Sequence, residues 1–81
     1  MTKQEIIQQT NAFFSERMDF DMSHVTPETE LKRDMGMTSL DAINTAIFVK
    51  HTFGITPQES DIKAIITLQD LYDFIEANQA M

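Results

Sequence analysis

The residue with the clearest chemical potential is Ser39, which follows a loop containing Gly36 and opens an apolar helical pattern. The N–H groups in the first turn of a helix have no acceptor within the helix, and the helix dipole is positive there. A phosphate placed at this point gains hydrogen bonds and a favourable field. The Ser39 hydroxyl therefore has two possible roles, as a plain helix cap or as the attachment point of a phosphate-linked group.

Other arrangements of reactive residues give weaker signals. A hydrolase nucleophile elbow reads Gly-x-Ser-x-Gly, but Gly36 lies three residues before Ser39 and no glycine follows in register. Residues 19–30 place ligand-type side chains at four positions of a calcium-binding loop, but His24 stands where that loop requires glycine. His24 and His51 lack metal-ligand spacing. The sequence therefore predicts neither a catalytic site nor a metal site.

The apolar periodicity predicts four helices that would position Ser39. Thr2 with Glu5, and Thr67 with Asp70, have the form of capping boxes, and Gly54 is a natural helix stop. The predicted helices cover residues 3–18, 38 or 39 to 51 or 52, 60–64 and 67–78. The expected fold is all-α, a four-helix bundle of three longer helices and one short helix, with a long loop after helix one.

The predicted loop spans residues 19–38, which is long for a connection inside a compact domain. Such loops are commonly functional or pinned to the core. Val25 and Leu31 are isolated apolar residues that we expect to pin it. Pro27 favours the first position of a helix, so Thr26 to Glu28 is predicted to open a single helical turn.

Length, charge and composition exclude several classes of protein. The 81 residues predict one domain, spanning 1–81, too small to enclose a deep active site as well as a core. Thirteen acidic against six basic residues give a net charge of −7, which argues against nucleic acid as a partner. The chain has no cysteine, no apolar run of membrane-spanning length and no signal-peptide pattern, so we expect a cytoplasmic monomer.

Residues 31–53 resemble the acyl carrier protein family. That family has an Asp-Leu-Gly-x-Asp-Ser-Leu motif leading into its second helix, and residues 34–40 here read Asp-Met-Gly-Met-Thr-Ser-Leu. The resemblance implies that Ser39 carries 4′-phosphopantetheine, whose thiol holds acyl groups as thioesters. It also implies a carrier that performs no catalysis, a phosphopantetheinyl transferase that installs the arm from coenzyme A, and partner enzymes that load, elongate or transfer acyl groups.

The chain departs from the family pattern at two places. Thr38 stands where the family usually has Asp before the serine, although Thr can also cap the helix. Asn44, Lys50 and His51 dilute the acidity of the helix face that usually meets basic partners. We therefore expect a specialised fatty-acid-like or polyketide-like pathway more than the housekeeping one. The single glycine of the motif makes the resemblance to peptidyl carriers poorer, although an aminoacyl cargo stays possible.

Apolar residues after Ser39 form two stripes, more than one bundle interior can cover. An exposed apolar stripe beside a functional residue is a plausible docking surface. The predicted partner contacts are Leu40, Asp41 and Ile43, with Thr38, Asn44 and Ile47 as further candidates. The predicted core comprises Phe13, Phe14, Phe48, Phe53, Leu68, Leu71 and Ile75. The alternative function is a small acidic helical interaction module without a prosthetic group.

Overall fold

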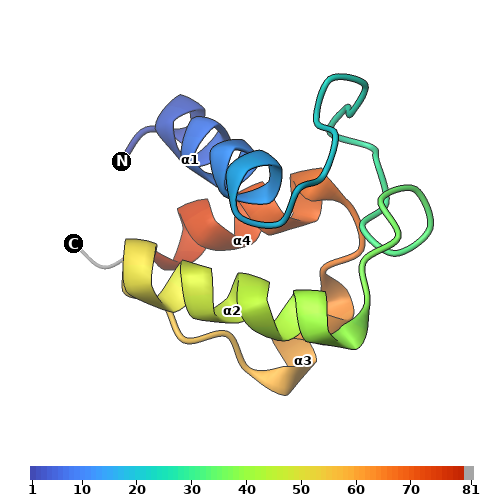
Figure 1. The fold of residues 1–81 in the computed structure, drawn as a ribbon. Coiled ribbons are helices and arrows are strands. Elements are labelled where there is room, and N and C mark those ends of the chain that lie inside the picture. Colours follow the sequence, from blue (N-terminus) through green and yellow to red (C-terminus); the bar gives the residue numbers. More distant parts are fainter. Residues whose placement is uncertain (80–81) are drawn as a thin grey trace.

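The computed structural model describes residues 1–79 and contains four helices in the predicted order (Figure 1). They are α1 (Lys3–Glu16), α2 (Ser39–Phe53), α3 (Glu59–Ala64) and α4 (Leu68–Asn78). No strand occurs within residues 1–79, and α1 packs against α4. The predicted all-α fold of three longer helices and one short helix is confirmed. None of the helices in this part of the chain is both long and apolar enough to cross a bilayer.

Capping boxes explain where three of these helices begin. Thr2 and Glu5 cap α1, and Thr67 and Asp70 cap α4; in each pair the threonine oxygen accepts from the backbone of the acidic residue. The helix α2 has a third box, which belongs to the site below. It ends at Phe53, one or two residues later than predicted, because Gly54 takes the left-handed φ of 73° that stops the helix.

The helix α1 ends at Glu16, so the predicted end at Met18 is wrong by two residues. Asp19 turns the chain with a φ of 58°, and the Phe20 N–H then donates to the Phe14 carbonyl at 2.9 Å. The Phe20 ring meets Phe14 edge-on at 6.0 Å between centroids. The apolar periodicity of the sequence extends two residues beyond α1 because Met18 also packs against the core, although it lies outside the helix.

One hydrophobic core joins the four helices and the long loop. Five of the seven predicted core residues are buried, whereas Phe13 and Phe48 are only partly buried and stack on each other at the edge, 4.2 Å between ring centroids. Sequence reasoning did not assign Thr10 and Thr45 to the interior, where both are buried. The buried hydrophobic residues are Ile6, Phe14, Leu31, Met37, Val49, Phe53, Ile55, Leu68, Leu71, Tyr72 and Ile75.

Replacing Thr10 with valine is expected to stabilise the protein. Within residues 1–79 the fully buried Thr10 hydroxyl has no hydrogen-bond partner. Valine keeps the shape and removes the desolvation cost, so we expect a gain of about 1 kcal/mol, or roughly 4–8 °C in Tm. Thr45→Val is the matched control, because that hydroxyl donates to the Asp41 carbonyl at 2.9 Å and its loss gives no such gain. Thermal unfolding by circular dichroism measures both, and an unchanged or lower Tm for Thr10→Val contradicts the argument.

The long loop is pinned as predicted, with Leu31 buried and Val25 packed against the core. Backbone bonds also tie it to the α3–α4 connection: the Leu31 N–H donates to the Ile66 carbonyl at 2.9 Å, and the Leu68 N–H to the Thr29 carbonyl at 3.0 Å. The predicted helical turn at residues 26–28 is wrong, because a single reverse turn closes there through a bond from the Thr29 N–H to the Thr26 carbonyl.

The Asp70 carboxylate is expected to make this junction depend on pH. Its Oδ2 accepts from the N–H groups of Ile66 and Thr67, both at 3.0 Å, and these bonds to Thr67 and Ile66 lower the pKa of Asp70. A lowered pKa means stability that is present above the unfolded-state value and lost as pH falls through the folded value. Asp70→Ala should therefore cost about 1 kcal/mol at pH 7, as lost caps do.

That cost should begin to shrink below about pH 4, the unfolded-state pKa of an aspartate, and should vanish as pH falls through the lower folded-state pKa of Asp70. Urea unfolding of both proteins between about pH 2 and pH 7 measures the difference in unfolding free energy. A difference that stays constant over this range would show that the Asp70 charge does not stabilise the junction.

Candidate functional site

A tight turn before α2 sets the position of Ser39. The Gly36 N–H donates to the Lys32 carbonyl at 3.1 Å, and the Met37 N–H to the Leu31 carbonyl at 3.0 Å. Gly36 has a φ of 72°, a left-handed conformation that glycine adopts without steric cost. Met37 is buried beneath this turn. Gly36 and the buried Met37 together fix the position and direction of the backbone where α2 begins.

Asp34, the first residue of the motif, closes the same turn. Its Oδ2 accepts from the Glu30 N–H at 2.8 Å, and its Oδ1 lies 3.3 Å from the Arg33 Nε. The Glu30 N–H, followed by the Arg33 guanidinium, lowers the pKa of Asp34, so the carboxylate is charged at neutral pH. The acidic residue of the motif therefore has a structural role, several residues away from the serine itself.

Thr38, and not Ser39, caps α2. The Thr38 Oγ1 accepts from the Asp41 N–H at 3.2 Å, and the Asp41 Oδ2 accepts from the Thr38 N–H at 2.9 Å. Ser39 is the first helical residue, is exposed, and its hydroxyl makes no hydrogen bond within residues 1–79. The interpretation of Ser39 as a plain N-cap is therefore wrong. Its hydroxyl is free to react.

Two backbone donors remain open beside that hydroxyl. The Asp41 N–H is bound by the Thr38 cap and the Ala42 N–H by the Thr38 carbonyl at 3.0 Å. The N–H groups of Ser39 and Leu40 have no acceptor within residues 1–79, as expected at a helix start. A phosphate on the Ser39 oxygen lies next to these donors and to the positive end of the helix dipole. The site therefore fits a phosphodiester at Ser39.

A groove of about 640 Å³ runs from Ser39 between α2, the turn before it and α3. We call it the α2–α3 groove. Apolar side chains dominate it, and charged residues stand at its rim; the Lys63 Nζ there lies 3.3 Å from Glu59, and the Arg33 Nη2 lies 3.0 Å from Glu30. Its main apolar lining residues are Leu31, Met37, Ala42, Ile43, Ala46, Val49, Ile62, Ile65, Ile66, Leu71 and Phe74. The groove offers an apolar chain tethered at Ser39 a place out of water.

The structure spreads the predicted partner contacts over the outer face of α2. Leu40, Ile43 and Ile47 are 65%, 56% and 49% exposed, so all three are accessible, including Ile47, for which the sequence argued least. Asp41 is half-buried, and its Oδ2 accepts from the Thr38 N–H in the capping box. Thr38 and Asn44 are exposed, and Asn44 and Ile47 line a second groove on the α1 side, away from Ser39.

Sequence reasoning missed two apolar residues of the site, Ile62 and Ile66. They are 39% and 55% exposed and line the α2–α3 groove opposite Ile43. A signal existed in the sequence, because a helix of six residues is too short to bury isoleucines on its own, and α3 indeed contains no buried residue. Asp21, at the third position of the calcium-loop pattern in residues 19–30, instead has a local role: its carboxylate accepts from the Ser23 N–H and hydroxyl in a turn.

Comparison with known proteins agrees with this geometry. Residues 12–75 match the family described as the phosphopantetheine attachment site. The acyl carrier protein of Thermotoga maritima is 31% identical over 75 residues, which are 93% of each chain. The chain belongs to the acyl carrier protein family. The acyl carrier protein of Rubrobacter xylanophilus is 27% identical over 79 residues, 98% of each chain.

The crystal structure of the Thermotoga maritima acyl carrier protein superposes with a TM-score of 0.81 at 25% identity, covering 93% of this chain and 87% of that one. Family membership implies a covalently attached 4′-phosphopantetheine, with a phosphopantetheinyl transferase and acyl-handling enzymes as partners. The chain is accordingly a carrier and not an enzyme. The alternative of an interaction module without a prosthetic group is thereby disfavoured.

Proposed function

We propose that residues 1–81 form a single acyl-carrier domain in which Ser39 bears the 4′-phosphopantetheine. The observation that carries this proposal is the free, exposed Ser39 hydroxyl at the first position of α2, next to a threonine that does the capping. When attached, the group supplies a thiol that holds acyl chains as thioesters. A short oxygen-bearing arm at a helix start is suited to a phosphodiester, because the surrounding donors favour negative charge.

The chain's own residues have distinct tasks in this function. Thr38 and Asp41 hold the first turn of α2 rigid, so that the Ser39 oxygen has a fixed position. The Ser39 and Leu40 N–H groups bind the phosphate. The α2–α3 groove shelters the first part of an apolar acyl chain, while Leu40 and Ile43 stay exposed for partner enzymes.

We also propose that the acyl group belongs to a specialised fatty-acid-like or polyketide-like pathway. Thr38 supports this, since it leaves the residue before the serine uncharged, and so does the outer face of α2, where Asn44, Lys50 and His51 are all exposed. A partner with a strongly basic docking surface gains little from that face. The cytoplasmic location and the monomeric state stay predictions from the sequence.

Intact mass spectrometry tests the attachment. The apo protein is incubated with coenzyme A and a broad-specificity phosphopantetheinyl transferase, and we expect one phosphopantetheine increment. Digestion should place it on the peptide that contains Ser39. No increment with any transferase, together with none on protein from its native source, would rule the carrier function out for this chain.

The pathway is tested with the holo protein and purified housekeeping fatty-acid enzymes. We expect loading and elongation well below the rates seen with a housekeeping carrier in the same assay, because the outer face of α2 is less acidic. Equal rates for the two carriers would contradict the specialised pathway while leaving the attachment at Ser39 intact.

A further inference from the structure

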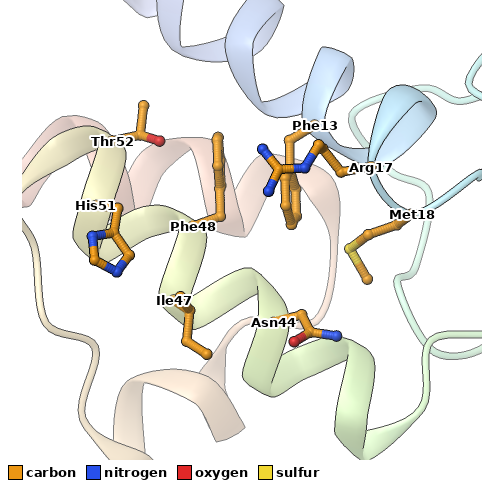
Figure 2. A pocket seen from close by; sticks show the side chains of 8 residues that line it. All are labelled: Phe13, Arg17, Met18, Asn44, Ile47, Phe48, His51 and Thr52. Atoms are coloured by element: carbon orange, nitrogen blue, oxygen red, sulfur yellow. The ribbon is translucent and has the colours of Figure 1, made fainter.

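A second groove lies on the opposite side of α2 from the one beside Ser39. Its volume is about 360 Å³, and it runs between the C-terminal end of α1 and the second half of α2 (Figure 2). We call it the α1–α2 groove. Its lining residues are Phe13, Arg17, Met18, Asn44, Ile47, Phe48, His51 and Thr52. None of the tasks proposed for Ser39 and its groove uses this surface.

The floor of the α1–α2 groove is a rigid apolar platform. The Phe13 and Phe48 rings stack at 4.2 Å with 10° between their planes, and Phe48 in turn meets Phe53 edge-on at 5.7 Å. Ile47 adds an aliphatic wall that is 49% exposed. Aromatic surface that is already ordered binds an apolar side chain without further loss of conformational entropy.

The rim of the groove carries the Arg17 cation and no acidic residue, in contrast to the chain as a whole. None of the eight lining residues is acidic, although 13 of the 81 residues of the chain are. Arg17 comes from the end of α1 and His51 from α2, and Figure 2 shows His51 and Thr52 at one end of the groove and Met18 at the other. Arg17 forms no ion pair within residues 1–79. A negatively charged group therefore finds free donors here.

The α1–α2 groove is continuous with the surface beside Ser39. Ile47 belongs both to this groove and to the exposed stripe with Leu40 and Ile43. From Ser39 to His51 the helix rises about 18 Å, which a partner enzyme covers in one standard interface.

We propose that the α1–α2 groove is a second docking site, which receives an acidic, apolar segment of an acyl-handling partner enzyme. An apolar side chain of that segment packs on Phe13 and Phe48, and a carboxylate pairs with Arg17. The proposal rests on the carrier function proposed above. It predicts that the partners of this carrier are selected partly by negative charge at this groove, although the carrier itself has a net charge of −7.

The test uses the holo protein, ¹⁵N-labelled, and two synthetic amphipathic helical peptides. Both peptides carry leucine on one face; one has glutamate beside it and the other has lysine. We expect the glutamate peptide to shift the amide signals of residues 13–18 and 44–52, and the lysine peptide to leave them in place. The double variant Arg17→Glu/His51→Glu should weaken binding of the glutamate peptide by about tenfold, because it removes the Arg17 cation and places two carboxylates beside the peptide's own.

Lys63→Glu is the matched control, since Lys63 lines the α2–α3 groove and should not affect this peptide. Thermal unfolding verifies that the double variant folds. Equal binding of both peptides, shifts confined to residues 39–43 and 62–66, or unchanged affinity in the double variant would overturn the proposal. Shifts of the same signals on adding decanoate would also overturn it, because the groove would then bind a free amphiphile. Shifts on raising the protein concentration alone would mean that the groove binds a second copy of the chain.

Failure of this proposal and failure of the carrier function are distinguishable. The peptide titration is repeated on the apo protein, which keeps the α1–α2 groove whether or not Ser39 is modified. Loading is read separately by intact mass.

Discussion

The Ser39→Ala variant is expected to acquire no phosphopantetheine at all while keeping its fold. The substitution removes the only atom that can form the phosphodiester at this position, so the mass increment should vanish instead of decreasing. The exposed hydroxyl makes no hydrogen bond within residues 1–79, and Thr38 still caps the helix. We therefore expect the unfolding free energy to change by less than about 0.5 kcal/mol, as is usual for exposed positions.

Ser60→Ala supplies a matched control for this result. Ser60 is also exposed and also lies in the first turn of a helix, α3, but no tight turn precedes it and it does not line the α2–α3 groove. We expect it to load like the wild type, as measured by intact mass after the same incubation. Residual loading of Ser39→Ala, or loss of loading in Ser60→Ala, would place the attachment elsewhere in the chain.

Much of the fold could be predicted because each helix carries its own start and stop signals. Thr2, Thr67 and Gly54 act locally, through side-chain caps and a left-handed φ, so sequence alone suffices for them. The end of α1 was misplaced because it depends on Phe20 folding back onto Phe14, a contact that periodicity does not encode. The partial burial of Phe13 and Phe48 likewise depends on how α1 meets α2.

The candidate site was predictable in its centre and less so at its edges. Ser39 and its turn lie within one short segment, and their geometry follows from local residue types. Ile62 and Ile66 line the same groove as Ser39, and the long loop is bonded to the α3–α4 connection next to them, which is a long-range contact that local residue types do not encode. Asp41 was predicted as a partner contact, and in this structure its Oδ2 accepts from the Thr38 N–H, so it supports the first turn of α2, which presents Ser39. Its contact with partners stays a prediction.

The outer face of α2 separates two grooves of different character. On one side Ile43 borders the apolar groove that starts at Ser39, and on the other Ile47 borders the α1–α2 groove, which carries Arg17 at its rim. The exposed stripe of Leu40, Ile43 and Ile47 is the ridge between them. A partner enzyme that binds across this ridge meets the arm, the apolar stripe and the charged rim in one interface, which offers three independent means of discrimination.

Ile43→Asp is expected to reduce acyl transfer by partner enzymes about 30-fold without preventing attachment of the arm. Ile43 is 56% exposed, one turn from Ser39, so a partner that approaches the arm covers its side chain. Loss of a central apolar contact costs about 2 kcal/mol, and a buried aspartate without a partner adds to this. The readout is the specificity constant kcat/KM of an acyl-loading enzyme for the holo variant.

A charge control and two apolar variants of Ile43 separate docking from a general effect of charge. Gln8→Asp, on the exposed face of α1, changes the net charge equally and should leave kcat/KM unaltered. Ile43→Leu should retain most of the activity and Ile43→Ala an intermediate amount, because the buried apolar area makes the contact.

Since Ile43 also lines the α2–α3 groove, the three Ile43 variants are compared with a short and a long acyl group. A loss that appears only with the long chain would mean that Ile43 shelters the cargo and does not dock the partner, whereas an equal loss with both chains supports docking.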